Sequence, residues 1–121
     1  GGADFQNLDV GNDKPLYQYV AERCAAWDEH DNVGLVVGAT APEELERLRD
    51  AVDRPFLVPG VGAQGGDAEA AVEYGLADGV GLVNSSRGIV FAGEGADDEG
   101  AYFRAVGDAA KRLKRRLNEF R

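Results

Sequence analysis

Two loops in the sequence, at 59–67 and 84–89, carry residue types that could bind an anion such as phosphate. Four of the seven residues from 60 to 66 are glycines, and glycine lets backbone N–H groups approach a ligand closely. The second loop offers small side chains and one guanidinium. Each loop follows an apolar run, and parallel α/β proteins place their ligand sites at the carboxyl ends of strands. The two loops together therefore predict an anion-binding site.

Three residues of these loops are the candidate phosphate ligands: Gln64, Ser86 and Arg87. A guanidinium can hold a phosphate through two charge-assisted hydrogen bonds, and Gln64 can donate from its side-chain amide. The backbone N–H groups of Ser86 and Arg87 can complete the shell. Taken singly, Arg87 could be a surface ion-pair partner, Gln64 a solvated side chain and the glycines a tight turn. The expected convergence of the loops favours phosphate binding over these alternatives.

Three short apolar runs predict the strands that must bring the loops together. They cover 33–37, 56–58 and 80–83 and are apolar at successive positions, as buried parallel strands are. Segments with helical spacing separate them. Because short strands alternate with helices along the chain, the sequence predicts right-handed βαβ units in a parallel sheet of an α/β protein.

The expected helices lie at 15–30, from residue 40 onward, at 67–74 and at 99–120. We expect Thr40 to cap the second helix ahead of Pro42, and Asp67 to cap the third. Trp27 and Phe103 are expected on the inner faces of the first and last helices. No strand run precedes the first helix, although βαβ architecture would supply one. We therefore expect the chain to begin partway through a domain.

The composition is acidic, and its single cysteine fits a protein of the reducing cytoplasm. Twenty-two acidic and 13 basic residues give the 121-residue chain a net charge of −9, which disfavours nucleic-acid binding because phosphate backbones need a basic footprint. The excess of Asp and Glu residues, together with few lysines, resembles the surface composition of salt-adapted proteins. Cys24 is the single cysteine, so an internal disulfide is excluded. No secretory leader and no apolar run near the roughly 18 residues of a membrane span is visible.

The remaining candidates for chemistry are weaker. His30 has no triad or metal partner nearby in sequence, so we expect a structural role. Cys24 is expected to be a buried small hydrophobe. The carboxylate pairs at 43–44 and 97–98 are expected to be solvated helix starts rather than metal ligands. The basic run at 111–116 is expected to be a solvated helix end.

The two loops resemble those of orotidine 5′-phosphate decarboxylase. The first reads Pro-Gly-Val-Gly-Ala-Gln-Gly-Gly-Asp, and the second ends in Ser-Arg-Gly-Ile after a further apolar run. The segment 32–66 and the loop at 84–89 are similar to the bacterial-type branch of that family. A complete (β/α)₈ barrel needs about 250 residues. The resemblance therefore implies that residues 1–121 are one partial domain, the C-terminal part of a TIM barrel with about three strands.

The resemblance also implies roles for individual residues. Gln64 and Arg87 would bind the substrate phosphate with help from the backbone N–H groups of Ser86 and Arg87. Pro59 and Val61 would line the pyrimidine side of the pocket. The intact enzyme would be a homodimer that converts orotidine 5′-monophosphate to uridine 5′-monophosphate without a cofactor.

The family's catalytic array is absent from the sequence. Its core reads Asp-x-Lys-x-x-Asp, and none of Lys14, Lys111 and Lys114 has an aspartate two residues before it. We therefore expect no catalytic residue and no metal in this chain, and a need for the N-terminal half or a companion chain. Two alternatives stay open: another barrel enzyme that binds a pentulose phosphate, and a non-catalytic half-barrel that binds phosphate compounds or assembles with a partner.

Overall fold

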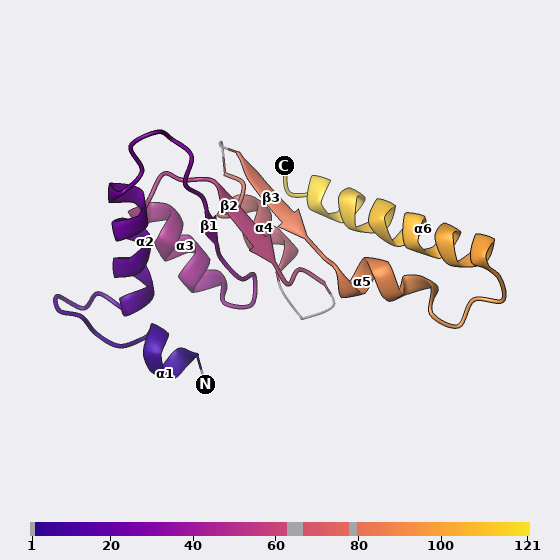
Figure 1. Cartoon of the computed structure of the whole chain (residues 1–121), viewed down its shortest axis with the longest axis horizontal. Coiled ribbons are helices and arrows are strands. Elements are labelled where there is room, and N and C mark those ends of the chain that lie inside the picture. Colours follow the sequence, from indigo (N-terminus) through magenta and orange to yellow (C-terminus); the bar gives the residue numbers. More distant parts are fainter. Residues whose placement is uncertain (1, 63–66, 78–79) are drawn as a thin grey trace.

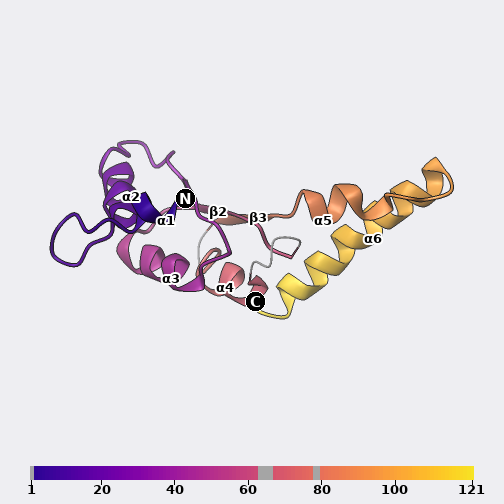
Figure 2. The same ribbon diagram turned by 90° about the horizontal axis from the view of Figure 1, so that it is seen from below.

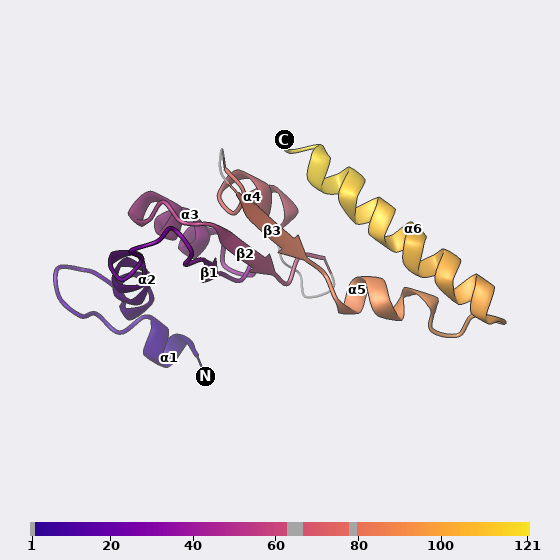
Figure 3. The ribbon, with the colours of Figure 1, turned by 45° about the horizontal axis from the view of Figure 1, so that its top comes forward.

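A three-stranded parallel sheet forms the centre of the computed structural model, which describes residues 2–62, 67–77 and 80–121 (Figure 1). The strands are β1 (Leu35–Val36), β2 (Phe56–Pro59) and β3 (Gly81–Asn84), in the order β1-β2-β3. Figure 3 shows the arrowheads of β2 and β3 pointing the same way, towards the helix that follows β3. The expected strands therefore form and pair in parallel, which confirms the α/β class.

Helices connect the strands and extend the chain at both ends. Their bounds are α1 (Ala3–Gln6), α2 (Leu16–Ala26), α3 (Pro42–Ala51), α4 (Ala68–Glu73), α5 (Arg87–Val90), the 3₁₀ turn η1 (Phe91–Gly93) and α6 (Glu99–Asn118). Figure 2 shows α3 and α4 together on one side of the sheet. The α5–α6 pair extends away from α1 and α2 (Figure 1), and the Tyr102 hydroxyl of α6 donates to the Val90 carbonyl at 2.7 Å. No helix in the described part of the chain is long and apolar enough to cross a membrane.

The hydrophobic core lies between the sheet and the layer formed by α3 and α4. Phe56 and Val58 of β2 point into it and are 1% and 0% exposed. They pack with Leu45 of α3 and Ala71 of α4, which are also buried. Alternation along β2 sends these side chains to one face, so the other face of the sheet must be covered differently.

That other face is open in this chain. The register aligns Val36, Leu57 and Leu82 in one row across the three strands, and Val36 and Leu82 are 71% and 67% exposed. In a closed barrel this face is the interior, which side chains from all the strands fill together. The exposed row therefore fits a sheet that forms part of a barrel.

Arg49 ties α3 to the ends of α4 and β2. Its guanidinium donates to the carbonyl oxygens of Tyr74 at 2.7 Å, Arg54 at 3.1 Å and Gly75 at 3.2 Å. The same group lies 3.9 Å from the centre of the Phe56 ring. Burial lowers the pKa of Arg49, while the nearby Asp53 carboxylate opposes that shift. One side chain thus satisfies three carbonyl groups at the edge of the core.

We expect Arg49→Lys to destabilise the chain by about 2 kcal/mol, because an ammonium group cannot reach all three carbonyls in the planar geometry of a guanidinium. Arg47→Lys is the matched control, since Arg47 is an exposed arginine of the same helix. Urea unfolding of both variants measures the difference. Equal stability of the two variants would contradict this role for Arg49.

Two of the helix boundaries that differ from the sequence-based expectation have a clear cause, while α4 and α6 differ from it by only one or two residues at an end. The first expected helix ends at Ala26 rather than residue 30, because the Asp28 carboxylate accepts hydrogen bonds from the N–H groups of Asn32 and Val33 and forms a turn there. The expected cap at Thr40 is wrong, and Ala41 is the N-cap of α3 without a side-chain hydrogen bond. Pro42 takes the first helical position, so the residue directly before it must be the cap.

Two apolar side chains also lie elsewhere than expected. Trp27 and Phe103 were expected on inner faces, but they are 67% and 61% exposed. Leu113 and Leu117 of α6 pack against the core instead, near the C-terminal end of that helix. The N-terminal part of α6 packs against α5 and η1 rather than the sheet (Figure 1), which leaves Phe103 without a cover.

Candidate phosphate-binding site

The carboxyl ends of β2 and β3 lie side by side, and the loops that follow them line one cavity. Pro59 and Asn84, the last residues of the two strands, are register partners. The cavity has a volume of about 220 Å³ and is lined by Pro59, Gly60, Val61, Asn84, Ser85, Ser86 and Arg87. The described parts of the two loops therefore meet, as the sequence predicts.

Ala39, which follows β1, holds both ends of the glycine-rich loop. Its N–H donates to the Pro59 carbonyl at 3.0 Å, and its carbonyl accepts from the Asp67 N–H at 3.0 Å. Gly60 and Gly62 have φ values of 94° and 84°, a region that side chains disfavour. The loop leaves β2 through this glycine-dependent turn and returns to a fixed point beside β1. Gln64, one of the candidate ligands, lies outside the described residues.

Asp67 ends this loop and begins α4. Its carboxylate accepts hydrogen bonds from the N–H groups of Glu69 at 2.8 Å and Ala70 at 3.4 Å, which confirms the expected cap. The cap satisfies N–H groups that have no partner within the helix. Asp67 is therefore occupied by the helix and is not a candidate ligand.

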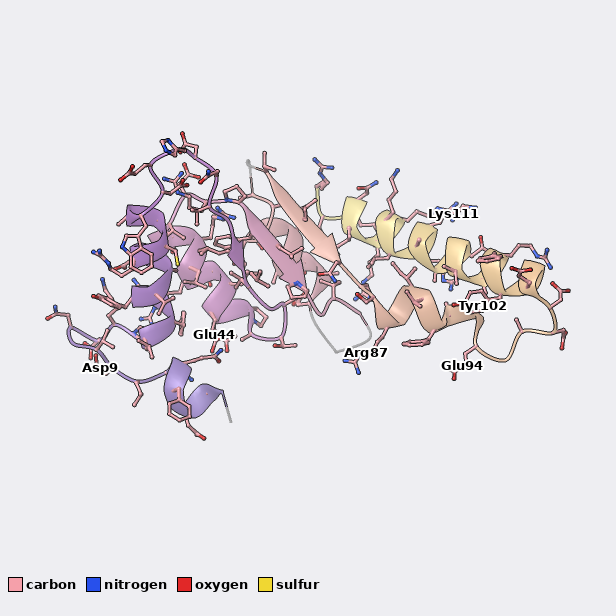
Figure 4. All side chains as sticks on the ribbon, viewed as in Figure 1. Asp9, Glu44, Arg87, Glu94, Tyr102 and Lys111 are labelled. Atoms are coloured by element: carbon pink, nitrogen blue, oxygen red, sulfur yellow. The ribbon has the colours of Figure 1, made fainter. Side chains whose placement is uncertain are left out.

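Arg87 lies at the mouth of the cavity as the first residue of α5. Figure 4 shows its side chain projecting outward from the start of that helix. The guanidinium is exposed and makes no hydrogen bond or ion pair with a described residue. Nor do the backbone N–H groups of Ser86 and Arg87 bond to a described residue. These unpaired donors beside one cavity are what an anion needs.

The pocket-lining residues Pro59 and Val61 differ in exposure. Pro59 is half-buried at the end of β2, in the strand row that contains Leu57. Val61 borders the cavity but is only 1% exposed, so its side chain belongs mainly to the core. Both residues border the cavity, and their contact with a pyrimidine stays a prediction.

Asn84 is a further residue of this site that the sequence did not single out. Its side-chain Nδ2 donates to the Ser86 Oγ at 3.3 Å. A polar residue at the carboxyl end of a predicted strand, two residues before a candidate ligand, was the available signal. Strand alternation puts Asn84 on the same face as Leu82.

The weaker candidates gather no chemistry in the described part of the chain. His30 is exposed, and Cys24 is half-buried rather than buried as expected. Asp98 caps α6 through the N–H of Ala101 at 2.7 Å. No group of three or more possible metal ligands occurs among the residues described.

A larger cavity of about 560 Å³ lies between α2 and α3 and is lined by charged residues of both signs, including Asp13, Lys14, Glu46 and Arg47. It lies on the helical layer, away from the carboxyl ends of the strands.

The cavity at the ends of β2 and β3 has a smaller volume than the roughly 300 Å³ at which whole small-molecule pockets begin. Its size suits one group of a ligand, such as a phosphate.

The fold and the site together define a class. They form a segment of parallel α/β structure in which two consecutive strand-to-helix loops line one cavity. In phosphate-binding (β/α)₈ barrels the last two such loops hold the phosphate at the same end of the strands. Comparisons with known proteins give a more particular similarity.

The chain is similar over its whole length to orotidine 5′-phosphate decarboxylases. It is 81% identical to that of Natronomonas pharaonis and 63% identical to that of Halorubrum lacusprofundi, covering 45% and 48% of those proteins. The structure of Leishmania donovani OMP decarboxylase matches 94% of this chain and 44% of its own, with a TM-score of 0.67 and 38% identity. The chain thus spans about half the length of the curated relatives it matches. No protein-family model matches it.

These similarities confirm the resemblance to the decarboxylase but not to its bacterial-type branch. The relatives of 81% and 63% identity come from halophilic archaea, whereas that from the bacterium Ralstonia nicotianae is 45% identical. The archaeal sources fit the salt-adapted composition.

Proposed function

We propose that residues 1–121 are one partial domain, the phosphate-binding C-terminal part of an orotidine 5′-phosphate decarboxylase. The whole protein would convert orotidine 5′-monophosphate to uridine 5′-monophosphate and CO₂ in pyrimidine synthesis. The observation that carries the proposal is the cavity at the ends of β2 and β3, bordered by the Arg87 guanidinium and the N–H groups at 86 and 87, none of which bonds to another described residue. The 81% identity to a named decarboxylase supports it.

Phosphate binding at this site would contribute to catalysis from a distance. A phosphate held away from the reacting carbon can supply binding energy that helps the site to close and so lowers the barrier. Arg87 and Gln64 would grip the phosphate, and Pro59 and Val61 would border the pyrimidine. Neither Arg87 nor Gln64 would transfer a proton.

The proton donor and its charged partners would come from outside this chain. The open face of the sheet, with Val36 and Leu82 exposed, is where the remaining strands of a barrel would pack. The rest of the protein or a companion chain would cover it, and the complete enzyme would work without a cofactor, as a homodimer in the cytoplasm.

A binding experiment tests this proposal in what we term the restored protein. In it, the chain replaces the matching segment of the Natronomonas pharaonis relative, to which it is 81% identical. Calorimetry should show that uridine 5′-monophosphate binds at least about 100-fold more tightly than uridine, because charged hydrogen bonds to phosphate contribute several kcal/mol together. Equal affinities for the nucleotide and the nucleoside would contradict phosphate binding.

A further inference from the structure

The side chain of Asn84 contacts Ser86 and is not part of the hydrophobic core. It is the last residue of β3, it is exposed, and it pairs in register with Pro59. Its side chain lines the same cavity as Ser86 and Arg87, and its Nδ2 donates to the Ser86 Oγ at 3.3 Å. Both partners of this bond therefore border the space where the anion would lie.

The main chain of Ser86 is fixed independently of this bond. Its carbonyl accepts from the N–H groups of Ile89 at 3.2 Å and Val90 at 2.8 Å, within the first turn of α5. The hydroxyl group is thus the movable part of Ser86, and Asn84 is its hydrogen-bond partner among the described residues. Among the described residues, that contact is what can fix the direction of the hydroxyl.

The direction of the bond decides what the hydroxyl can do. A serine hydroxyl has one proton to donate and two lone pairs that accept. Because Asn84 donates to the oxygen, the Ser86 proton is left for another acceptor. A hydroxyl that accepts one bond is also polarised to donate a stronger one. The pair Asn84–Ser86 therefore offers a directed donor to an anion in the cavity.

We propose that Asn84 is a positioning residue of the phosphate site, which orients the Ser86 hydroxyl so that it donates to the substrate phosphate. This inference rests on the proposed function of the cavity. Asn84 acts through Ser86 and donates no bond to the phosphate itself. A carboxylate at position 84 would reverse the arrangement, because it would accept the Ser86 proton and place a negative charge beside the anion.

A double-mutant cycle in the restored protein tests the coupling. Asn84→Ala and Ser86→Ala should each weaken the binding of uridine 5′-monophosphate about 10- to 150-fold, the effect of one lost hydrogen bond to a charged group. The double variant should be no weaker than either single variant, because both changes remove the same bond to phosphate. Uridine should bind all variants equally, which also shows that each variant is folded.

Two further variants sharpen the result. Asn84→Asp should weaken nucleotide binding more than Asn84→Ala, and Ser86→Thr should restore most of the affinity that Ser86→Ala loses, since threonine keeps the hydroxyl. Independent, multiplying effects of Asn84→Ala and Ser86→Ala would overturn the inference. Equal weakening of uridine would do the same, because it would show a general structural role.

The failure of this inference differs from failure of the proposed function. If Arg87→Ala weakens nucleotide binding but Asn84→Ala does not, the phosphate site stands and the role of Asn84 is wrong. If the unaltered restored protein binds the nucleotide no more tightly than uridine, both the phosphate site and the role of Asn84 are wrong.

Discussion

The 121-residue chain alone should show no decarboxylation of orotidine 5′-monophosphate, whereas the restored protein should be active. The reaction needs a positioned proton donor, and none of Lys14, Lys111 and Lys114 has the family's aspartate spacing. Positioned acid and charge stabilisation account for most of an enzyme's rate, so removing the array should abolish activity rather than reduce it. The absorbance of the substrate, followed over time, measures this directly.

Two controls define the result. Heat-treated chain sets the background, and the restored protein shows that the chain is competent when the missing segment is supplied. Loss of substrate absorbance with the chain alone, above the heat-treated control, would show that its own residues carry the chemistry. If the restored protein binds the nucleotide tightly but is inactive, the defect lies in the part of the barrel outside residues 1–121.

Arg87→Ala in the restored protein should lower kcat/KM by about 2–4 kcal/mol, roughly 30- to 1000-fold, the range for removing one partner of a well-placed charged contact. The guanidinium is exposed and unpaired with any described residue, so its loss should leave folding unaffected. Gln64→Ala should cost less, because an amide is a neutral donor. Arg87→Lys should fall between, since it keeps the charge but loses the forked geometry.

A substrate without phosphate distinguishes a role of Arg87 in phosphate binding from a structural role. Orotidine offers no phosphate, so Arg87→Ala should leave its slow turnover unchanged. Arg112→Ala is the matched control, because Arg112 is an exposed arginine on α6, distant in sequence from both loops. Equal slowing of orotidine and the nucleotide by Arg87→Ala would show that Arg87 has a structural or catalytic role.

The sequence predicted the strands well because each is a short apolar run between clear helix signals. β2 is one residue longer than the expected range and β3 is shifted by one residue, whereas β1 covers only Leu35–Val36 of the expected 33–37. Asp67 caps α4 as expected because its carboxylate accepts hydrogen bonds from the first N–H groups of that helix. Parallel pairing then followed from the short strand-to-strand interval. The meeting of the loops at 59–62 and 84–87 was a consequence of that topology.

Features that depend on tertiary neighbours were less predictable. Trp27 and Phe103 fit an apolar stripe, but a stripe does not say whether a partner layer covers it, and here both are exposed. Arg49 looks like any helix-surface arginine, yet it bridges residues 25 and 26 positions away. The Asn84–Ser86 bond depends on side-chain rotamers, which the two-residue spacing does not determine.

A crystal structure of the restored protein with uridine 5′-monophosphate would test the central claim most directly. The phosphate should lie in the cavity between the ends of β2 and β3, with two guanidinium nitrogens of Arg87 within about 3 Å of its oxygens, as in charge-assisted bonds. The backbone N–H groups of Ser86 and Arg87 should point at the same oxygens. A phosphate bound elsewhere, with Arg87 still free in solvent, would contradict the account.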